Sequence, residues 1–497
     1  MIPIIEQAKN HFNRIAIYSS GKSYTYEQLI ESSGYYAKKL LNNKDDLREE
    51  RVAFMVKPGF NYVMVQWGIW QAGGVAVPLD INSPIELLQN IINETKPLTL
   101  VIDKDFAEMV QSLLENHQCK VITIDTEQTY YSNQTYSDLN IDLDRMALIL
   151  YKSDNIKLTK GVVITHANIY AQINSLVKSL EWKKNDYTLS LLPLHQIQGI
   201  IDVVCCSLWV GACCEFLFKF NEANIFQTFG EGKVTLFMAD SNIYNRLIKF
   251  WNEIPYREKL LIQEKMEHQR LMVNTSTLMS VSMLHKWKKI SGQTLIERYG
   301  MTETGMVFSN PLKGKRNPGY VGKPLPKVQV RIADENNKSI GIGSLGEIQV
   351  KGPNVFKMYW NKEQETKDAF TKDGWFRTGD IGIIENDNFK LLGKDNADII
   401  TLEGNKISAL EIEQVLKAHK NIIDCSVIGL KDESLGKVAC AIIVPKLPIS
   451  ENNLKRWLKN KLDSDKIPKK FMMIDKLPKN SSGKISKGIL IKQFQEL

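Results

Sequence analysis

Apolar runs of strand character alternate with amphipathic segments over most of the chain, most clearly between residues 51 and 124. The first two runs are each followed by a segment with the periodicity of a helix. The apolar runs lie at residues 51–56, 75–79, 98–102 and 120–124, and the helical segments lie at 59–73 and 83–94. Strands that alternate with helices usually form parallel sheets that the helices cover. The pattern therefore predicts an α/β fold for this part of the chain.

The pattern changes near Gly319, where short apolar runs are separated by turns rich in Gly, Asn and Asp. Strands are expected at residues 328–332 and 346–351. Turn residues at such close spacing favour strands joined by short loops. The change predicts a β-rich subdomain.

A smaller α+β unit is predicted after Leu392-Gly393-Lys394. Its helices are expected at 409–418 and 451–461, and its strands at 425–428 and 438–444. A chain of 497 residues is too long for one hydrophobic core. We therefore place a domain boundary at residues 393–395, between an N-terminal core domain, 1–392, and a C-terminal lid domain, 393–497.

Composition and charge are those of an ordinary soluble protein, with 43% hydrophobic and 24% charged residues. The net charge of +8 fits either attraction of anionic small molecules, such as nucleotides and coenzyme A, or a lysine-rich solvated surface. No run of five or six like charges indicates a nucleic-acid partner. No apolar stretch reaches 18 residues and no signal-length run begins the chain, so we expect no membrane span and a cytoplasmic location.

Seven cysteines occur, including two adjacent pairs at 205–206 and 213–214. Neither pair has CxxC spacing, and both lie in the apolar segment 200–218. Buried reduced thiols are therefore expected, and a metal site is not. The segment 200–211 is apolar but short, so it is expected to be a core element.

Candidate chemistry is densest at residues 297–305, which combine a cation, an aromatic ring, a hydroxyl and a carboxylate with two glycines. Thr302 beside Glu303 can hold Mg²⁺ on the phosphates of ATP, because Mg²⁺ takes a few hard oxygen ligands and keeps its waters. The alternative is that Thr302 caps a helix with Glu303 in its first turn.

A second candidate segment is 373–380, in which Asp373-Gly374 predicts a turn and Gly379-Asp380 ends the following strand. A carboxylate at a strand end can accept hydrogen bonds from a ribose diol. The alternative for Asp380 is an ordinary turn residue.

The third candidate segment is 478–487, where Lys484 lies on a loop rich in Ser and Gly. A mobile cation there can neutralise charge that develops between a carboxylate and the α-phosphate of a nucleotide. The alternative is a solvated basic tail.

These three motifs, in this order, resemble the signatures of the adenylate-forming superfamily, which activates carboxylic acids with ATP. The chain is most similar to its malonyl-CoA synthetase group. The resemblance runs from residues 24–29 to Lys484, and further matching segments are 301–306, 309–312, 318–326 and 407–411.

The resemblance implies a fold of two doubly wound subdomains plus the β-rich subdomain, followed by a small mobile α+β domain. It implies ATP, Mg²⁺ and coenzyme A as cofactors, and a carboxylic acid as substrate. Lys484, Thr302 and Glu303 would be catalytic, with Thr302 and Glu303 holding the metal. The nucleotide and coenzyme A would contact Ser153, Lys160, Gly161, Tyr299, Gly300, Asp380, Lys394 and Gly404.

The acid itself is assigned to Arg298, His195 and Met306. The resemblance pairs Arg298 with the distal carboxylate of malonate, and a guanidinium fork suits a carboxylate. The alternative is a structural salt bridge with Glu297 or another acid.

The sequence also departs from the family pattern. The phosphate loop, 151–161, has Asp154 and Lys157 in place of glycines that turn backbone N–H groups toward phosphates. The family has arginine at Lys394, and lysine loses the bidentate fork. Further departures are Gln196 and Gln198 in place of histidines, 274–277 in place of small residues, and Glu403 in place of a glycine beside Gly404.

These features predict an ATP-dependent acid–CoA ligase, with malonate or methylmalonate favoured. One alternative is a catalytically impaired relative that binds nucleotide or adenylate, since fold alone does not define function. The other is a ligase that loads the thiol of a carrier protein.

Overall fold

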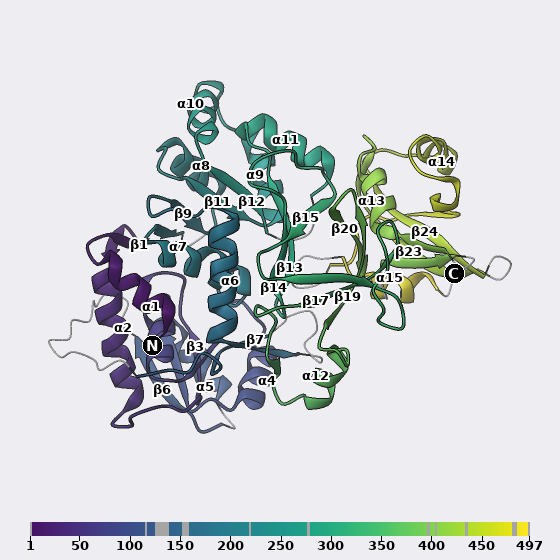
Figure 1. Ribbon diagram of the computed structural model, residues 1–497. Coiled ribbons are helices and arrows are strands. Elements are labelled where there is room, and N and C mark those ends of the chain that lie inside the picture. The colour runs from purple at the N-terminus through teal and green to yellow at the C-terminus, as the bar shows by residue number, and fades with distance from the viewer. Residues whose placement is uncertain are drawn as a thin grey trace.

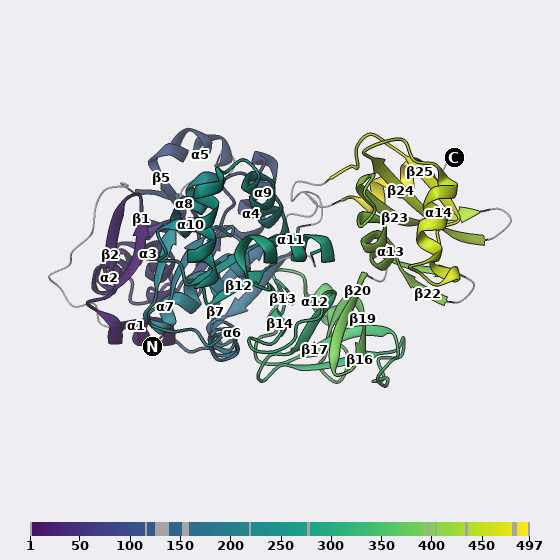
Figure 2. The same ribbon diagram turned by 90° about the horizontal axis from the view of Figure 1, so that it is seen from above.

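The computed structural model describes residues 2–114, 117–124, 139–151, 159–217, 220–275, 279–394, 398–402, 405–432, 436–479 and 485–495. Figure 1 shows a large N-terminal part and a smaller C-terminal part that lies beyond β19 and β20. Figure 2 shows the same separation from above. Ser153, Gly404 and Lys484 lie outside the described residues, as does the altered part of the phosphate loop.

The first sheet has seven strands in the order β18-β8-β7-β4-β3-β5-β6. Its five strands from β7 to β6 are parallel, β8 pairs antiparallel with β7, and β18 pairs antiparallel with β8. The strands are β3 (Arg51–Met55), β4 (Val75–Pro78), β5 (Thr99–Asp103), β6 (Lys120–Ile124), β7 (Met146–Tyr151), β8 (Gly161–Thr165) and β18 (Met358–Tyr359). The strands and helices expected over residues 51–124 are confirmed, with α3 at Phe60–Gln71 and α4 at Ile85–Thr95, and the structure adds α5 at Ala107–Leu113.

Helix α3 forms because its sequence is apolar on every side, and such a helix must be buried. Trp67 and Trp70 in it are fully buried. The indole N–H of Trp70 donates to the carbonyl of Ala147 on β7 at 2.8 Å. This bond satisfies a polar group in the core and fixes the helix on the sheet.

The second sheet has thirteen strands and changes character along its width. Its first part is parallel from β1 to β13, with β2 antiparallel at the edge. These strands are β1 (Ile15–Ser19), β2 (Lys22–Thr25), β9 (Tyr187–Ser190), β10 (Cys213–Phe216), β11 (Leu236–Ala239), β12 (Leu271–Asn274) and β13 (Ile296–Met301). The helices that pack with this part are α1 (Pro3–Ala8), α2 (Tyr26–Leu41), α6 (His166–Ser179), α7 (Cys206–Val210), α8 (Glu222–Gly230), α9 (Ser241–Trp251), α10 (Tyr256–Glu267) and α11 (Val281–Ser291).

The remaining strands of this sheet are antiparallel and form the β-rich subdomain. They are β14 (Gly305–Ser309), β15 (Tyr320–Pro324), β16 (Gln329–Ala333), β17 (Gly346–Lys351), β19 (Phe376–Glu385) and β20 (Asn388–Lys394), and α12 (Glu363–Ala369) lies beside them in the sequence. The β-rich subdomain is therefore a continuation of the second α/β sheet.

The C-terminal part is built on a three-stranded sheet with helices against it, as expected. Its elements are β21 (Ile399–Leu402), β22 (Asn405–Ser408), α13 (Ala409–Lys417), β23 (Ile422–Asp432), β24 (Gly436–Pro445), α14 (Glu451–Lys459), β25 (Lys470–Met473) and α15 (Lys487–Phe494). Its buried apolar residues form their own clusters. The boundary at 393–395 stays a prediction.

Three local expectations are settled by the structure. The segment 200–211 is buried, and it forms a π-helix, η3 (Gln198–Cys205), that continues into α7. The strand expected to end at Asp380 does not end there, because β19 continues to Glu385 through a bulge at 381–382. The helix that Thr302 would cap is absent, because β14 begins at Gly305. Among the described residues, no helix is both long and apolar enough to cross a bilayer.

Candidate active site

The hairpin of β13 and β14 carries most of the predicted site residues. Residues 302–304 form its turn, and the backbone N–H of Met301 donates to Thr304 Oγ1 at 3.3 Å. A Cβ on Gly300 would lie 2.1 Å from the carbonyl oxygen of Gly305. Gly300 is therefore required by the closeness of the two strands, whatever it does for a nucleotide.

Glu303 is buried where the two large sheets meet. Its Oε1 accepts a hydrogen bond from the hydroxyl of Tyr359, on β18 of the first sheet, at 2.9 Å. Its carbonyl accepts from the backbone N–H of Phe356 at 2.7 Å. Burial raises the pKa of Tyr359 and the charge of Glu303 raises it further, so the hydroxyl stays a donor. Tyr359 therefore fixes the direction of this carboxylate.

Lys160 and Gly161 lie on the other side of Tyr359, at the start of β8. The ammonium of Lys160 lies 2.7 Å from Glu365 Oε2 and 4.9 Å from the centre of the Tyr359 ring. A Cβ on Gly161 would lie 2.9 Å from the ring of Tyr151. Lys160, Tyr359 and Glu303 thus form a continuous contact from the phosphate-loop strand to the predicted metal site.

Tyr299 and Asp380 are brought together although they lie in different motifs. The Tyr299 hydroxyl donates to Asp380 Oδ2 at 2.6 Å, and both side chains are buried. The Tyr299 ring is tilted against Phe308 on β14 with 5.7 Å between centroids. The pairing of β19 with β20 places Lys394 opposite Asp380. Three predicted nucleotide contacts therefore share one location.

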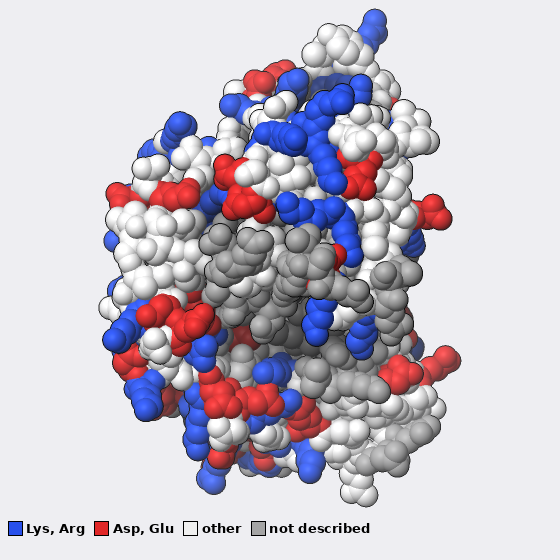
Figure 3. Space-filling view, turned by 90° about the vertical axis from the view of Figure 1, so that its right-hand side faces the viewer, with Lys and Arg blue, Asp and Glu red and all other residues white. Residues whose placement is uncertain are grey.

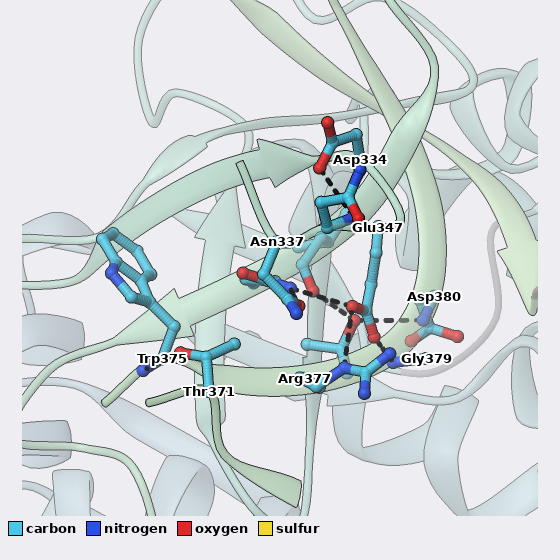
Figure 4. A network of polar contacts seen from close by, with 12 residues as sticks. Asp334, Asn337, Glu347, Thr371, Trp375, Arg377, Gly379 and Asp380 are labelled. Atoms are coloured by element: carbon cyan, nitrogen blue, oxygen red, sulfur yellow. Dashed lines mark hydrogen bonds and ion pairs between the residues drawn. The ribbon is translucent and has the colours of Figure 1, made fainter. Parts of the chain in front are cut away.

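A polar network behind Asp380 holds its strand in place (Figure 4). The backbone N–H of Gly379 donates to Glu347 Oε1 at 3.1 Å, and Arg377 lies 3.3 Å from Glu347 Oε2. The Asp380 N–H donates to Thr378 Oγ1 at 3.0 Å, and this hydroxyl donates to the carbonyl of Ile348 at 2.7 Å. These bonds fix the backbone at Gly379, whose φ is +69°.

Arg298 forms a buried ion pair with Asp202, and the two side chains are 2% and 1% exposed. The bond runs from Arg298 Nη1 to Asp202 Oδ2. Burial raises the pKa of Asp202, while the charge of Arg298 lowers it. The salt bridge expected for Arg298 therefore exists, and its partner is Asp202 rather than the adjacent Glu297.

That pair leaves one edge of the guanidinium unused. Arg298 Nε and Nη2 are buried and have no hydrogen-bond partner among the described residues. These two nitrogens point their N–H groups to the same side, which is the geometry that binds a carboxylate through both oxygens. The edge can therefore hold a ligand carboxylate while Asp202 keeps Nη1.

The other two residues assigned to the acid have different surroundings. His195 Nδ1 lies 3.6 Å from Asp80 Oδ1, and burial lowers the pKa of His195 while Asp80 opposes that shift. Met306 is buried on β14, opposite Gly300 in the hairpin register. No described contact joins Met306 to a polar group, so its predicted role in binding the acid stays untested.

Glu297 is a buried carboxylate that supports the hairpin from behind. Its Oε1 accepts the backbone N–H of Met279 at 2.9 Å. Burial raises its pKa to about 7, against the lowering effect of backbone hydrogen bonds from Met279 and Gly319. Glu297 therefore ties β13 to the segments that follow residue 278 and precede β15.

Sequence reasoning missed Asp202, Tyr359 and Glu347 as neighbours of the site. Asp202 had a usable signal, because it is the single acidic residue in an apolar helix. Tyr359 and Glu347 had none, since a tyrosine or glutamate near a predicted strand is ordinary.

Comparison with known proteins assigns the family. A sequence model of the AMP-binding enzyme family matches residues 4–360, and a model of the C-terminal domain of AMP-binding enzymes matches 411–484. The chain belongs to this family, and the predicted superfamily is confirmed.

Its relatives include malonate–CoA ligases. The mitochondrial malonate–CoA ligase ACSF3 of Mus musculus is 34% identical over 528 residues, covering 99% of this chain and 91% of the relative. The malonate–CoA ligase of Arabidopsis thaliana is 34% identical over 538 residues, covering 98% and 88%. The ATP-bound structure of MatB from Rhodopseudomonas palustris has a TM-score of 0.89 and 27% identity, covering 100% of this chain and 99% of that chain. The predicted fold class is therefore confirmed.

The raised pKa of Glu297 makes a prediction about stability. The folded protein holds a proton up to about pH 7 that the unfolded chain releases near pH 4. The contribution of Glu297 to the free energy of unfolding is therefore fully present below about pH 4. It is lost as the pH rises to about 7, and the total loss is about 3 kcal/mol. Since Gln does not ionise, the Tm of wild type should fall by a few degrees relative to Glu297→Gln between about pH 5 and 8.

Differential scanning fluorimetry over this pH range measures the effect. The exposed Glu363→Gln is the control for loss of one carboxylate, and its Tm difference from wild type should not follow the pH. A Tm difference between wild type and Glu297→Gln that stays constant over the range would contradict the assignment.

Proposed function

We propose that the protein is an ATP-dependent acid–CoA ligase that activates a small carboxylic acid, with malonate or methylmalonate favoured. A carboxylate oxygen of the acid attacks the α-phosphorus of ATP, and the bond to the pyrophosphate oxygen breaks. The thiol of coenzyme A, after losing its proton, then attacks the acyl carbon, and AMP leaves. Family membership and the malonate–CoA ligase relatives support both steps.

The observation that carries the choice of acid is the unused edge of Arg298. Burying a cation with two unpaired N–H donors costs folding free energy unless a ligand or another residue accepts hydrogen bonds from them. One carboxylate of a dicarboxylate can accept hydrogen bonds from both donors, and its second carboxylate remains free to react with ATP. A monocarboxylate of the same size has no group for this edge.

The nucleotide half of the proposal rests on the Tyr299–Asp380 pair. The hydroxyl of Tyr299 occupies one oxygen of Asp380 and orients the carboxylate. We assign the ribose diol to Asp380 and Lys394, and the base to Tyr299 and Gly300. The phosphates are assigned to Ser153, Lys160 and Gly161.

Mg²⁺ suits the residues at the hairpin turn. Thr302 and Glu303 provide hard oxygens, and the Tyr359 bond holds the Glu303 carboxylate in one direction. Bound with ATP, the ion would supply positive charge on the phosphates.

The second half-reaction is assigned to the C-terminal domain, with Gly404 at the arm of coenzyme A. A carrier-protein thiol is the alternative acceptor. Figure 3 shows the face on the side of this domain, where Lys and Arg gather in the upper part and positive and negative side chains alternate below.

A cytoplasmic location also stays a prediction, since the vertebrate relatives carry mitochondrial names.

The proposed function makes a prediction about the choice of acid. The protein should catalyse exchange of labelled pyrophosphate into ATP with malonate or methylmalonate, and far less with propionate, fatty, aryl or amino acids. Arg298→Lys keeps the charge but loses the fork, so the KM for malonate should rise about 10–100-fold, as expected for a charged hydrogen bond worth about 1.5–3 kcal/mol. The KM for ATP should change little and serves as the internal control.

Two outcomes would contradict this prediction. Folded protein that gives no exchange with any acid would exclude the ligase and favour the nucleotide-binding relative. Exchange with monocarboxylates but not with malonate would exclude the role proposed for Arg298.

The second prediction concerns Lys484. Lys484→Ala should lower the exchange rate by two or more orders of magnitude, because one key electrostatic donor contributes about 3 kcal/mol to the transition state. Lys492→Ala, an exposed lysine on α15, is the matched control and should exchange as wild type does. Equal rates for the two variants would show that Lys484 is not catalytic.

A further inference from the structure

Three polar atoms of the Arg298–Asp202 pair are buried and make no hydrogen bond with any described residue. They are Arg298 Nε, Arg298 Nη2 and Asp202 Oδ1, and none has a hydrogen-bond partner among the residues that the structure describes. Of the ion pairs between described residues, this one is the least exposed. Each unanswered buried atom costs free energy in the absence of a ligand. The pair therefore has unused capacity both to donate and to accept hydrogen bonds.

Among the residues that the structure describes, Arg298 is the cation that acts on Asp202. Its own helix and α7 contribute Cys205 and Cys206, whose pKa values burial raises first and the charge of Asp202 raises further, so both thiols stay neutral. From α9, Tyr244 faces Arg298 and donates its hydroxyl to the carbonyl of Val273 at 3.0 Å. Arg298 on β13 is the charged group that acts on Asp202.

The other elements packed on η3 direct their titratable groups elsewhere. On β9, the Tyr187 hydroxyl donates to Glu215 Oε2 at 2.7 Å. On α6, the His166 ring lies edge-on to Trp70, with 5.7 Å between centroids. Before η3, His195 lies beside Asp80. The charge balance at Asp202 is therefore set by Arg298 and by whatever binds beside it.

Charge counting shows what a dicarboxylate would meet. The pair alone is neutral. A ligand carboxylate on the Nε–Nη2 edge would give two carboxylates on one guanidinium, inside a site of low dielectric constant. Two carboxylates that share a buried site do not both stay ionised, and one of them holds a proton.

We propose that binding of the acid's distal carboxylate to Arg298 is coupled to uptake of one proton by the two carboxylates that then flank the guanidinium, and that Asp202 thereby helps to determine the specificity for the acid. The inference rests on the proposed function, because it requires a dicarboxylate at Arg298. The proton comes from solvent and returns to it when the ligand leaves. While the ligand is bound, one of the two carboxylates, that of Asp202 or that of the ligand, holds this proton.

A structural ion pair makes the opposite prediction. If the pair is only structural, the ligand carboxylate does not bind at Arg298, and ligand binding moves no proton at Asp202. Stability alone is a weak reason for this pair, since buried ion pairs are often replaceable by apolar residues at no cost. Proton uptake therefore separates a binding role from a structural one.

The test is calorimetric titration of malonate into the full-length protein saturated with α,β-methylene-ATP, in which the bond that the reaction breaks is replaced by a stable one. Titrations at one pH in two buffers of different ionisation enthalpy give the number of protons taken up. Wild type should take up about one proton per malonate, and its Kd should rise about tenfold per pH unit above the apparent pKa of the pair. Propionate, which lacks the second carboxylate, should take up none.

Asp202→Asn is the matched variant, because the amide keeps the shape and mimics the protonated acid. It should bind malonate with no net proton uptake and with a Kd that no longer follows the pH. Asp144→Asn, at an exposed position, should behave as wild type. A Tm measurement checks that each variant is folded, and the proton count on wild type needs no variant.

The outcomes separate this inference from the proposed function. Malonate that binds wild type and supports pyrophosphate exchange, but takes up no proton, overturns the inference and leaves the ligase in place. An unchanged pH dependence in Asp202→Asn also overturns it. Protein that neither binds malonate nor catalyses exchange overturns both.

Discussion

The candidate site depends on the close backbone approach between Gly300 and Gly305. A side chain at either position would collide, with the carbonyl of Gly305 in one case and with Gln172 in the other. This contact lets β14 turn back against β13, and the second sheet changes there from parallel to antiparallel pairing. Residues 298–303 take their positions from that reversal. The β-rich subdomain follows from it too, since its strands continue the same sheet.

The second property of the site is the amount of charge that it buries. Arg298, Asp202, Glu297, Glu303 and Asp380 are all nearly inaccessible. Burying charged groups is unfavourable unless they are paired and hydrogen-bonded, and a core designed only for stability would avoid them. Tyr359, Tyr299 and the backbone of Met279 each donate a hydrogen bond to one of these carboxylates. The Arg298–Asp202 pair keeps three buried polar atoms without a described hydrogen-bond partner, so we look for the ligand there.

Two of the alternatives considered for the sequence are resolved by local geometry. Thr302 does not cap a helix, because the residues after the turn extend as β14. Arg298 does form a salt bridge, yet only one of its terminal nitrogens is used. The structural and ligand-binding interpretations of Arg298 are therefore compatible, since a planar guanidinium has donors on more than one edge.

The sequence by itself determined the order and type of the strands and the first two helices between residues 51 and 124, two strands of the β-rich subdomain and the main elements of the C-terminal part. Period-2 and period-3.6 patterns reflect only which face of a local segment is apolar, so they can be read without knowledge of distant residues. The motifs also selected Thr302, Glu303 and Asp380 as candidate site residues, because each motif combines unusual residue types at short spacing.

Only the tertiary structure decided which distant residues meet at the site. Asp202 pairs with Arg298 across 96 residues, Tyr299 with Asp380 across 81, and Tyr359 with Glu303 across 56. Such contacts follow from sheet order and register, which depend on packing between elements and leave no periodic trace in the chain. The charge state of the Arg298 site belongs to this second group, since burial sets it and burial exists only in the folded protein.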